Sequence, residues 1–219
     1  MNVLGISGTP RKNGNSHILL EHSLAPFKES GWDVTILGLH DLTVQPCKAC
    51  DHCRSYNGKC IIEDDMGLFY DAFRRCHALI VSTPVYYRNV SAQLKAVFDR
   101  HYAVTPEQPL RGKPGGAIAV GAGQGGGQAM TLAIVHNWFS SCGALTVPGE
   151  LNGVSAVAQA EGDILKQEKR LKQARILGEN VLQVAVKLNS EQVGPPDAEK
   201  WQGEIREGLT SPSPLAPGG

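Results

Sequence analysis

The stretch NVLGISGTPRKNGNS, residues 2–16, predicts how the start of the chain folds. Residues 2–7 read as a short apolar strand, and a helical pattern begins at Ile18, just after the stretch. A polar loop between a strand and the start of a helix presents free backbone N–H groups and the positive end of the helix dipole. This arrangement suits the binding of a phosphate group.

The loop within this stretch differs from an ordinary strand-to-helix turn. It occupies residues 7–16, whereas ordinary turns of this kind have ~2–6 residues. Its side chains add hydrogen-bond donors at Ser7, Thr9, Arg11 and Ser16. Neither the Walker spacing nor Gly-x-Gly-x-x-Gly is present, so a nucleoside triphosphate or dinucleotide site is not indicated. The alternative interpretation is a plain turn in which Ser16 is the helix N-cap.

Strand-like and helical segments alternate along the rest of the chain. Four more strands are expected, at residues 33–37, 78–82, 116–120 and 144–147. This alternation predicts an α/β fold, with a parallel sheet, right-handed crossovers and helices on both faces. Asp64 and Asp65 precede one helical pattern, and we expect them to act only as acids that cap its N-terminus.

One domain accounts for most of the chain. With 219 residues, of which 42% are hydrophobic, the chain is long enough for a single α/β domain with a core, which we expect at residues 1–188. Residues 189–219 turn to proline, glycine and serine. By composition we expect them to form a flexible tail.

Two further strand-end loops suit a flat ring system. Residues 83–91 combine a proline, two adjacent tyrosines and an asparagine at the end of a central strand. Aromatic faces stack on rings, and open α/β sheets bind ligands beyond the carboxyl ends of their strands. Residues 121–128 are rich in glycine, which lets the backbone approach a ligand closely. The alternative is that the tyrosines merely pack on the core.

Four of the six cysteines fall in one segment without a regular pattern, residues 45–62: Cys47, Cys50, Cys53 and Cys60. Thiolates at this spacing can converge on one soft inorganic centre, and iron–sulfur clusters are commonly held in this way. Zinc would also be satisfied by four cysteines, but zinc ribbons carry two separated Cys-x2-Cys pairs, so we prefer a cluster. The segment follows the second strand, and we therefore expect the cysteine site and the ring site to share one face of the sheet.

The charge balance argues against two classes of partner. Lys plus Arg and Asp plus Glu both number 21, so no net field favours nucleic acid or an anionic membrane. No apolar run reaches the ~20 residues that a membrane helix needs, and the first residues lack the pattern of a signal peptide. We expect a cytoplasmic protein, in which a compact cysteine cluster is more consistent with a metal or redox site than with structural disulfides.

Taken together, the three strand-end loops resemble those of the NADPH-dependent FMN reductase branch of the flavodoxin-like proteins. The four clustered cysteines make the chain similar to the iron–sulfur flavoproteins of anaerobic archaea and bacteria. The resemblance covers about residues 1–188. It implies a flavodoxin-like fold, with a five-stranded parallel sheet in the order 2-1-3-4-5 and helices on both faces.

The resemblance also implies two cofactors, FMN and a [4Fe–4S] cluster. The residues expected to wrap the FMN phosphate are Ser7, Thr9, Arg11, Asn13, Asn15 and Ser16. Those expected along one side of the ring are Pro84, Val85, Tyr86, Tyr87, Asn89 and Ser91. Those expected near its other edge are Gly121, Gly123, Gln124 and Gly125, and the expected cluster ligands are Cys47, Cys50, Cys53 and Cys60.

The function implied is electron transfer by a flavin-dependent oxidoreductase. Electrons would come from a donor such as ferredoxin, pass through the cluster to FMN and reach a small acceptor such as oxygen, peroxide or a quinone. Homodimers or homotetramers are implied as well. The cofactors carry the chemistry, and we single out no catalytic side chain. Two alternatives stay open: an NAD(P)H-dependent FMN or quinone reductase without a cluster, and a flavodoxin-like binding domain in which the cysteines hold zinc.

Overall fold

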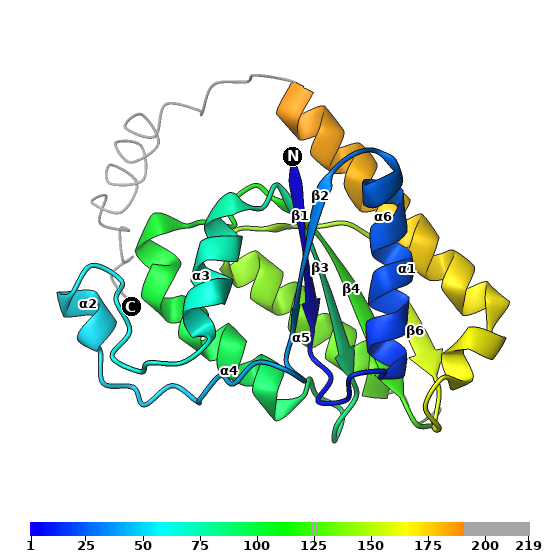
Figure 1. Ribbon diagram of the computed structural model, residues 1–219, viewed down its shortest axis with the longest axis horizontal. Helices are drawn as coiled ribbons and strands as arrows, with labels where there is room; N and C mark the ends of the chain where they lie inside the picture. Colours follow the sequence, from blue (N-terminus) through cyan, green and yellow to red (C-terminus); the bar gives the residue numbers. More distant parts are fainter. Residues whose placement is uncertain (124, 126, 191–219) are drawn as a thin grey trace, which may run out of the picture. The chain divides into compact units, whose positions relative to one another are not determined.

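A six-stranded parallel sheet forms the centre of the structure, a computed structural model that describes residues 1–123, 125 and 127–190 (Figure 1). The strand order is β2-β1-β3-β4, and β5 and β6 both pair with β4. All these pairs are parallel. The strands are β1 (Asn2–Ser7), β2 (Asp33–Gly38), β3 (Ala78–Pro84), β4 (Pro114–Gly121), β5 (Leu145–Thr146) and β6 (Val154–Val157). The expected flavodoxin-like fold and the order 2-1-3-4-5 are therefore confirmed, with a sixth strand attached.

The sixth strand arises because two short strands fill the edge position beside β4. β5 pairs with Pro114 and Gly115 at the start of β4, and β6 pairs with residues 118–121 further along it. The chain returns to the sheet at Gly153, whose φ of +146° favours glycine and where a Cβ would lie only 2.7 Å from the Ala117 oxygen. The sequence predicted the first of these strands and placed the second in a loop.

Helices cover both faces of the sheet, as expected (Figure 1). The longer helices are α1 (Asn15–Glu29) and α6 (Glu168–Ser190) on one face, and α3 (Met66–Arg75), α4 (Ala92–Arg100) and α5 (Gly127–Ser141) on the other. Three shorter helices lie in connections: α2 (His52–Ser55) and the 3-10 helices η1 (His101–Glu107) and η2 (Asp163–Lys166).

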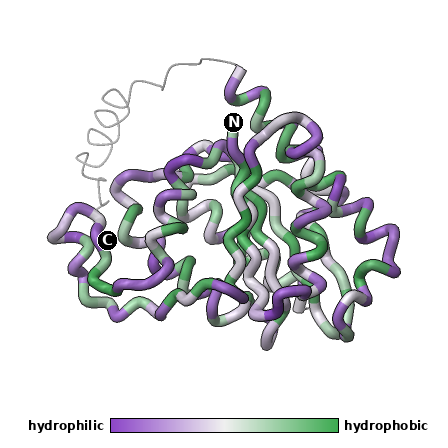
Figure 2. Tube along the Cα trace, in the orientation of Figure 1, coloured by the Kyte–Doolittle hydropathy of each residue, from purple (hydrophilic) through white to green (hydrophobic). Residues whose placement is uncertain are grey.

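Alternate residues of β3 point to opposite faces of the sheet, and this places a hydrophobic core on each side. Leu79 and Val81 pack with the residues of α3, α4 and α5, whereas Ala78 and Ile80 pack with those of α1 and α6. Figure 2 shows the central strands as predominantly hydrophobic. Because the sheet is covered on both sides, its strand ends remain the place where loops can form a site.

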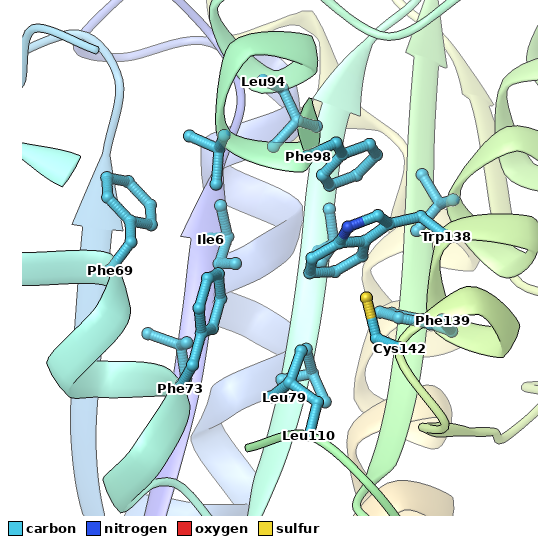
Figure 3. Packing of buried hydrophobic residues seen from close by; sticks show 14 of the residues in the cluster. Ile6, Phe69, Phe73, Leu79, Leu94, Phe98, Leu110, Trp138, Phe139 and Cys142 are labelled. Carbon is cyan, nitrogen blue, oxygen red and sulfur yellow. The ribbon is translucent and has the colours of Figure 1, made fainter. Parts of the chain in front are cut away.

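The core under α3, α4 and α5 is rich in aromatic rings (Figure 3). Phe98 stacks on Trp138 with 4.2 Å between the ring centroids. Cys76 and Cys142 are buried in the same core, which agrees with the apolar sequence around them. These two cysteines therefore belong to the packing and not to the cysteine-rich segment.

No helix in the described part of the chain is both long and apolar enough to cross a membrane. The expected tail, residues 189–219, lies outside the described residues except for Asn189 and Ser190, which end α6.

Candidate functional site

The loops that follow β1, β3, β4 and β6 surround one pocket of about 210 Å³, which we call the strand-end pocket. It lies at the carboxyl edge of the sheet, where ligands bind in open α/β folds. Its lining residues are Thr9, Arg11, Gly14, Asn15, Ser16, Pro84, Val85, Tyr86, Val120, Ala122, Ala158 and Gln159. The three loops singled out from the sequence thus meet at one place, and a fourth loop, after β6, joins them.

The first of these loops ends in a helix N-terminus that has no side-chain cap. α1 begins at Asn15, its N-cap is Gly14, and no side chain accepts a hydrogen bond from the first turn. The interpretation of Ser16 as N-cap is therefore wrong, because Ser16 already lies inside the helix. An uncapped first turn leaves backbone N–H groups and the positive helix end for an anion, which fits a phosphate.

Gly14 lets the phosphate loop close tightly. A Cβ at this position would lie 2.6 Å from Thr9 Oγ1, closer than side chains tolerate. Thr9 Oγ1 in turn accepts the backbone N–H of Arg11 at 3.1 Å. Contacts of Thr9 with Gly14 and Arg11 therefore set the shape of the turn. The Arg11 side chain is exposed at the rim of the pocket.

The remaining residues expected at the phosphate occupy different positions. The Asn15 side chain donates to the Ala160 oxygen at 2.8 Å and accepts the Ile164 N–H at 3.2 Å, so it ties α1 to the loop after β6. Ser7 is fully buried behind the loop, with its hydroxyl 3.0 Å from His17 Nδ1. Asn13 is exposed and does not line the pocket.

The loop after β3 is a tight hairpin turn. Tyr86 and Asn89 exchange two backbone hydrogen bonds of 3.0 Å, and the two residues between them, Tyr87 and Arg88, have φ of +47° and +63°. Two left-handed residues in succession make a type I′ turn, which is unusual without glycine or asparagine. As a result Tyr86 lines the pocket, while Tyr87 is fully exposed.

Two other residues expected beside the ring support this loop and do not line the pocket. The Asn89 side chain accepts the Val90 N–H at 2.8 Å. Ser91 is fully buried, caps α4 by accepting the Leu94 N–H at 3.2 Å, and donates to the Gly8 oxygen. Pro84, Val85 and Tyr86 are thus the members of the expected set that line the pocket.

The loop after β4 approaches the pocket through Val120 and Ala122. Gly121 is buried against the side chain of Gln128, and Gly123 and Gly125 are exposed. The predicted Gln124 lies outside the described residues. Gln128 was not singled out from the sequence, yet its amide donates to the oxygens of Gly123 and Ala156 at 2.7 and 3.3 Å and so joins this loop to β6.

Gln159 is a second residue that sequence reasoning missed. It lines the strand-end pocket and donates to the Ala122 oxygen at 2.9 Å. Its position depends on β6 pairing with β4, and β6 has only four residues, which is too short a segment to be recognised as a strand. The only signal in the sequence was a polar residue shortly after a short apolar segment.

The four clustered cysteines line a second cavity, of about 270 Å³, which we call the thiol cavity. All four are free; two are exposed and two, Cys53 and Cys60, are half-buried. Burial, followed by the nearby Cys60, raises the pKa of the Cys53 thiol. Asp99 and Tyr102 form the opposite wall. The four thiols thus line one space, and their role as ligands of one centre stays a prediction.

The spacing of these thiols can be tested against the groups that cysteines hold. Among residues 1–123, 125 and 127–190, no three His, Cys, Asp or Glu side chains converge closely enough for a single metal ion. Four sulfurs around one zinc ion would lie roughly 3.8 Å apart, given Zn–S bonds of about 2.3 Å in a tetrahedron. Four cysteine thiols on one cavity are also the donor set with which proteins hold a polynuclear iron–sulfur centre.

A buried arginine braces the cysteine-rich segment, and sequence reasoning missed it. The Arg100 side chain, 1% exposed, pairs with the Asp64 carboxylate, which is 4% exposed. It also donates to Cys60 Sγ at 3.5 Å. Burial would raise the pKa of Asp64, but hydrogen bonds from Arg100, then from the backbone of Gln45 and Met66, hold it below its usual value.

The expectation that the two aspartates are plain caps is therefore corrected. Asp64 does accept the Met66 N–H at 3.1 Å, at the start of α3, but its main partner is the buried guanidinium of Arg100. Asp65 is the N-cap residue of α3 but makes no side-chain capping bond, and its carboxylate accepts the Thr43 N–H at 2.7 Å. Asp64 thus binds the cysteine-rich segment through Gln45, and Asp65 binds the chain just before it through Thr43.

The two sites are separate in the folded chain. Their linings have no residue in common. The cysteine-rich segment leaves β2 beside β1, where the Leu39 N–H bonds to the Ser7 oxygen, but then runs away from the sheet to α2 (Figure 1). The thiol cavity lies at the last turn of α4, about 13 Å along this nine-residue helix from Ser91. We expected the cysteine site and the ring site to lie at the same face of the sheet. This holds only for the start of the connection after β2, and not for the cysteines.

Comparisons with known proteins agree with this geometry. Residues 1–160 match the family described as NADPH-dependent FMN reductase. The chain is 38% identical to an iron–sulfur flavoprotein of Methanocaldococcus jannaschii over 192 residues, which is 86% of this chain and 98% of the relative. It is also 38% identical to an iron–sulfur flavoprotein of Methanosarcina thermophila, over 67% of this chain and 77% of that one.

A solved structure supports the fold independently. The structure of RosB with a bound intermediate, 8-demethyl-8-formylriboflavin-5'-phosphate, superposes with a TM-score of 0.75. The match covers 100% of this chain and 91% of that chain, at 15% sequence identity. At such low identity the likeness concerns the fold alone.

Proposed function

Because the chain belongs to the NADPH-dependent FMN reductase family, as one of its iron–sulfur flavoproteins, we propose that it passes electrons from a donor such as ferredoxin through a [4Fe–4S] cluster to FMN. The final acceptor would be a small molecule such as oxygen, peroxide or a quinone. The chain is a flavin-dependent oxidoreductase. The observation that carries the proposal of a cluster is that four thiols line one cavity apart from the strand-end pocket.

FMN fits the strand-end pocket by its chemistry. The uncapped start of α1, with Thr9, Arg11 and Ser16 around it, would hold the phosphate. Pro84, Val85 and Tyr86 would border the isoalloxazine, whose ring supplies electron transfer when bound. Asn15 would border the ligand while it ties α1 to the loop after β6, and Ser7, Asn89 and Ser91 would fix the loops from behind. The exposed residues Asn13, Tyr87, Gly123 and Gly125 would approach the ligand from the surface.

The cysteine-rich segment fits a cluster through its donor set. Cys47, Cys50, Cys53 and Cys60 would supply four thiolates, and the cluster would supply single-electron transfer when bound. The backbone N–H of Ala49 donates to Cys47 Sγ at 3.4 Å, and Arg100 donates to Cys60 Sγ. Hydrogen bonds to sulfur of this kind set the potential of such centres.

A homo-oligomer would complete the strand-end pocket. Its volume of about 210 Å³ lies below the ~300–1,000 Å³ typical of ligand sites. Tyr87 and Arg88 follow the lining residue Tyr86 in the hairpin turn, and the Tyr87 side chain is fully exposed. We propose that a second copy, in a homodimer or homotetramer, covers this turn and closes the pocket over the flavin ring.

The second candidate is an NAD(P)H-dependent FMN or quinone reductase whose cysteines hold no cluster. It is favoured by the NADPH in the description of the matching family. No observation on the described residues supports zinc, since no three ligands converge on one ion there.

Anaerobic absorbance spectroscopy distinguishes the two candidates. Protein purified without oxygen is expected to show flavin bands on a broad visible background, and both are expected to bleach as dithionite is added. In the same cuvette, NADPH alone is expected to reduce the flavin slowly or not at all, and reduced ferredoxin is expected to reduce it rapidly. Flavin bands without the background, together with rapid turnover on NADPH, would establish the second candidate instead.

A further inference from the structure

Arg100 connects both sides of the cysteine-rich segment to α4. One terminal nitrogen, Nη1, donates to the Asp64 carboxylate. It also donates, at 3.3 Å, to the backbone oxygen of Gln45, which precedes the first cysteine. The other, Nη2, donates to Cys60 Sγ at 3.5 Å and to the Ile62 oxygen at 3.2 Å, around the last cysteine. Three of the four N–H bonds of the two terminal nitrogens thus go to this segment, and the fourth goes to Asp64, just after it.

The burial of this arginine is unusual for a cation. The Arg100 side chain is 1% exposed, and a charge removed from water to this degree needs a partner. Asp64 is that partner, and it also accepts the N–H groups of Gln45 and Met66 at 2.8 and 3.1 Å. The pair as a whole is neutral, so its effect on the surroundings depends on which end faces the thiols.

The positive end faces the sulfur. The guanidinium contacts Cys60 Sγ directly through Nη2, whereas the Asp64 carboxylate bonds to the other terminal nitrogen, Nη1. Because Arg100 and Asp64 are both almost fully buried, solvent screens their charges weakly, and the nearer charge has the larger effect since electrostatic energy falls with distance. The thiol cavity therefore experiences the cation more strongly than the anion.

We infer that Arg100 is a positioning residue that raises the reduction potential of the centre held by the four cysteines, and that Asp64 lowers it. The inference rests on the proposed function, because it concerns the cluster. Taking up one electron adds a negative charge beside Cys60. The N–H bond and the positive charge of Arg100 stabilise that reduced state, whereas the carboxylate of Asp64 destabilises it.

The test is an anaerobic redox titration of four chains with dithionite as the reductant. The chains are the wild type, Arg100→Gln, Asp64→Asn and Arg74→Gln. Cluster reduction is followed by electron paramagnetic resonance and FMN reduction by absorbance. Arg74→Gln is the matched control, because it removes the same charge from a nearby side chain. Arg74 bonds to Asp71 and Glu107 and not to a cysteine.

The expected shifts have opposite signs. Arg100→Gln is expected to make cluster reduction at least tenfold less favourable, a negative shift of about 59 mV for one electron. Asp64→Asn is expected to shift the potential in the positive direction, and Arg74→Gln is expected to leave it unchanged. The FMN potential is expected to stay constant in all four chains. Arg100→Lys, which keeps the charge and loses the fork of donors, is expected to recover most of the potential.

A merely structural role would give a different pattern. Loosening the segment would move Arg100→Gln and Asp64→Asn in the same direction, and that result, or no shift, would overturn the inference. Where a single variant holds no iron, the double variant Arg100→Gln/Asp64→Asn removes both buried charges and is titrated instead; a potential below that of the wild type is expected, because the nearer charge removed is the cation, and an unshifted potential would overturn the inference. Absence of iron from the double variant too would assign Arg100 to folding alone. Absence of iron from the wild type would overturn the proposed cluster and this inference with it, whereas full iron with unshifted potentials would overturn the inference only.

Discussion

The hydroxyl of Ser91 donates a hydrogen bond to the backbone oxygen of Gly8 across 2.5 Å, although 83 positions separate the two residues. The same hydroxyl accepts the Leu94 N–H at 3.2 Å and caps α4. One buried side chain thus fastens the phosphate loop to the helix whose other end carries Arg100. The two candidate sites are therefore connected through one rigid element.

Replacing this hydroxyl tests the connection. Ser91→Ala is expected to lower the free energy of unfolding by about 2 kcal/mol, because it removes a cap worth ~1 kcal/mol and leaves the Gly8 carbonyl without this partner. FMN affinity is expected to fall as well, although Ser91 does not line the pocket. Denaturant unfolding and FMN titration measure the two effects. Ser155→Ala, at an exposed position of β6, is the control; equal losses in both variants would contradict the role of Ser91.

Gly14 tests the shape of the phosphate loop. Gly14→Ala would place a Cβ 2.6 Å from Thr9 Oγ1, so the loop has to open. We expect the dissociation constant of FMN to rise about tenfold or more, which corresponds to ~1.4 kcal/mol. Gly67→Ala is the matched control, because a Cβ there meets no atom within 4 Å. Unchanged FMN binding in Gly14→Ala would show that the phosphate binds elsewhere.

Cys50 tests the independence of the two sites. Cys50→Ala is expected to abolish the visible background and the bound iron while FMN stays bound, because the two linings have no residue in common. Metal analysis and flavin absorbance on one sample provide both readings. Lys48→Ala, which alters an exposed neighbour on the wall of the same cavity, is expected to keep both cofactors. Loss of FMN together with the iron would mean that the segment supports the flavin pocket.

Acid is expected to destabilise the fold through His101. Burial lowers the pKa of this imidazole from 6.5 to about 4, and its neighbours are the Cys142 thiol and the rings of Phe73 and Trp138. Between these two values the unfolded chain binds a proton that the folded chain does not. Stability is therefore full above pH 6.5 and falls as the pH drops toward 4, by up to about 3 kcal/mol.

The measurement is denaturant unfolding at a series of pH values, for the wild type and for His101→Gln. The variant is expected to be less stable at pH 8, because the substitution disturbs the core, but to lose less stability between pH 6.5 and 4. Parallel pH profiles would mean that His101 does not titrate in this window.

The fold was readable from the sequence because each strand and helix carries its own pattern. Residues 78–81 are apolar in succession, as expected of a central strand covered on both faces, and they form the first part of β3. The second strand at this edge of the sheet, β6, could not be predicted from the sequence. β6 has four residues, and its place beside β4 depends on the close approach of Gly153 to Ala117, which is a tertiary contact.

The residues of the candidate site were also predicted only in part. The four cysteines were found because their spacing is local, and the structure gathers them around one cavity. Arg100 was missed because its partners are distant in the chain: Asp64 lies 36 positions and Cys60 40 positions away. In the sequence, a cation at the last turn of a helix is what the helix dipole favours, so nothing marked this one as buried.

Counting iron, acid-labile sulfide and FMN on one sample of anaerobically purified protein tests the central claim most directly. The account predicts about four irons, about four sulfides and one FMN per chain, as one [4Fe–4S] cluster ligated by four cysteines and one bound flavin require. One FMN per chain with neither iron nor sulfide would contradict it, and would leave the strand-end pocket as the only redox site.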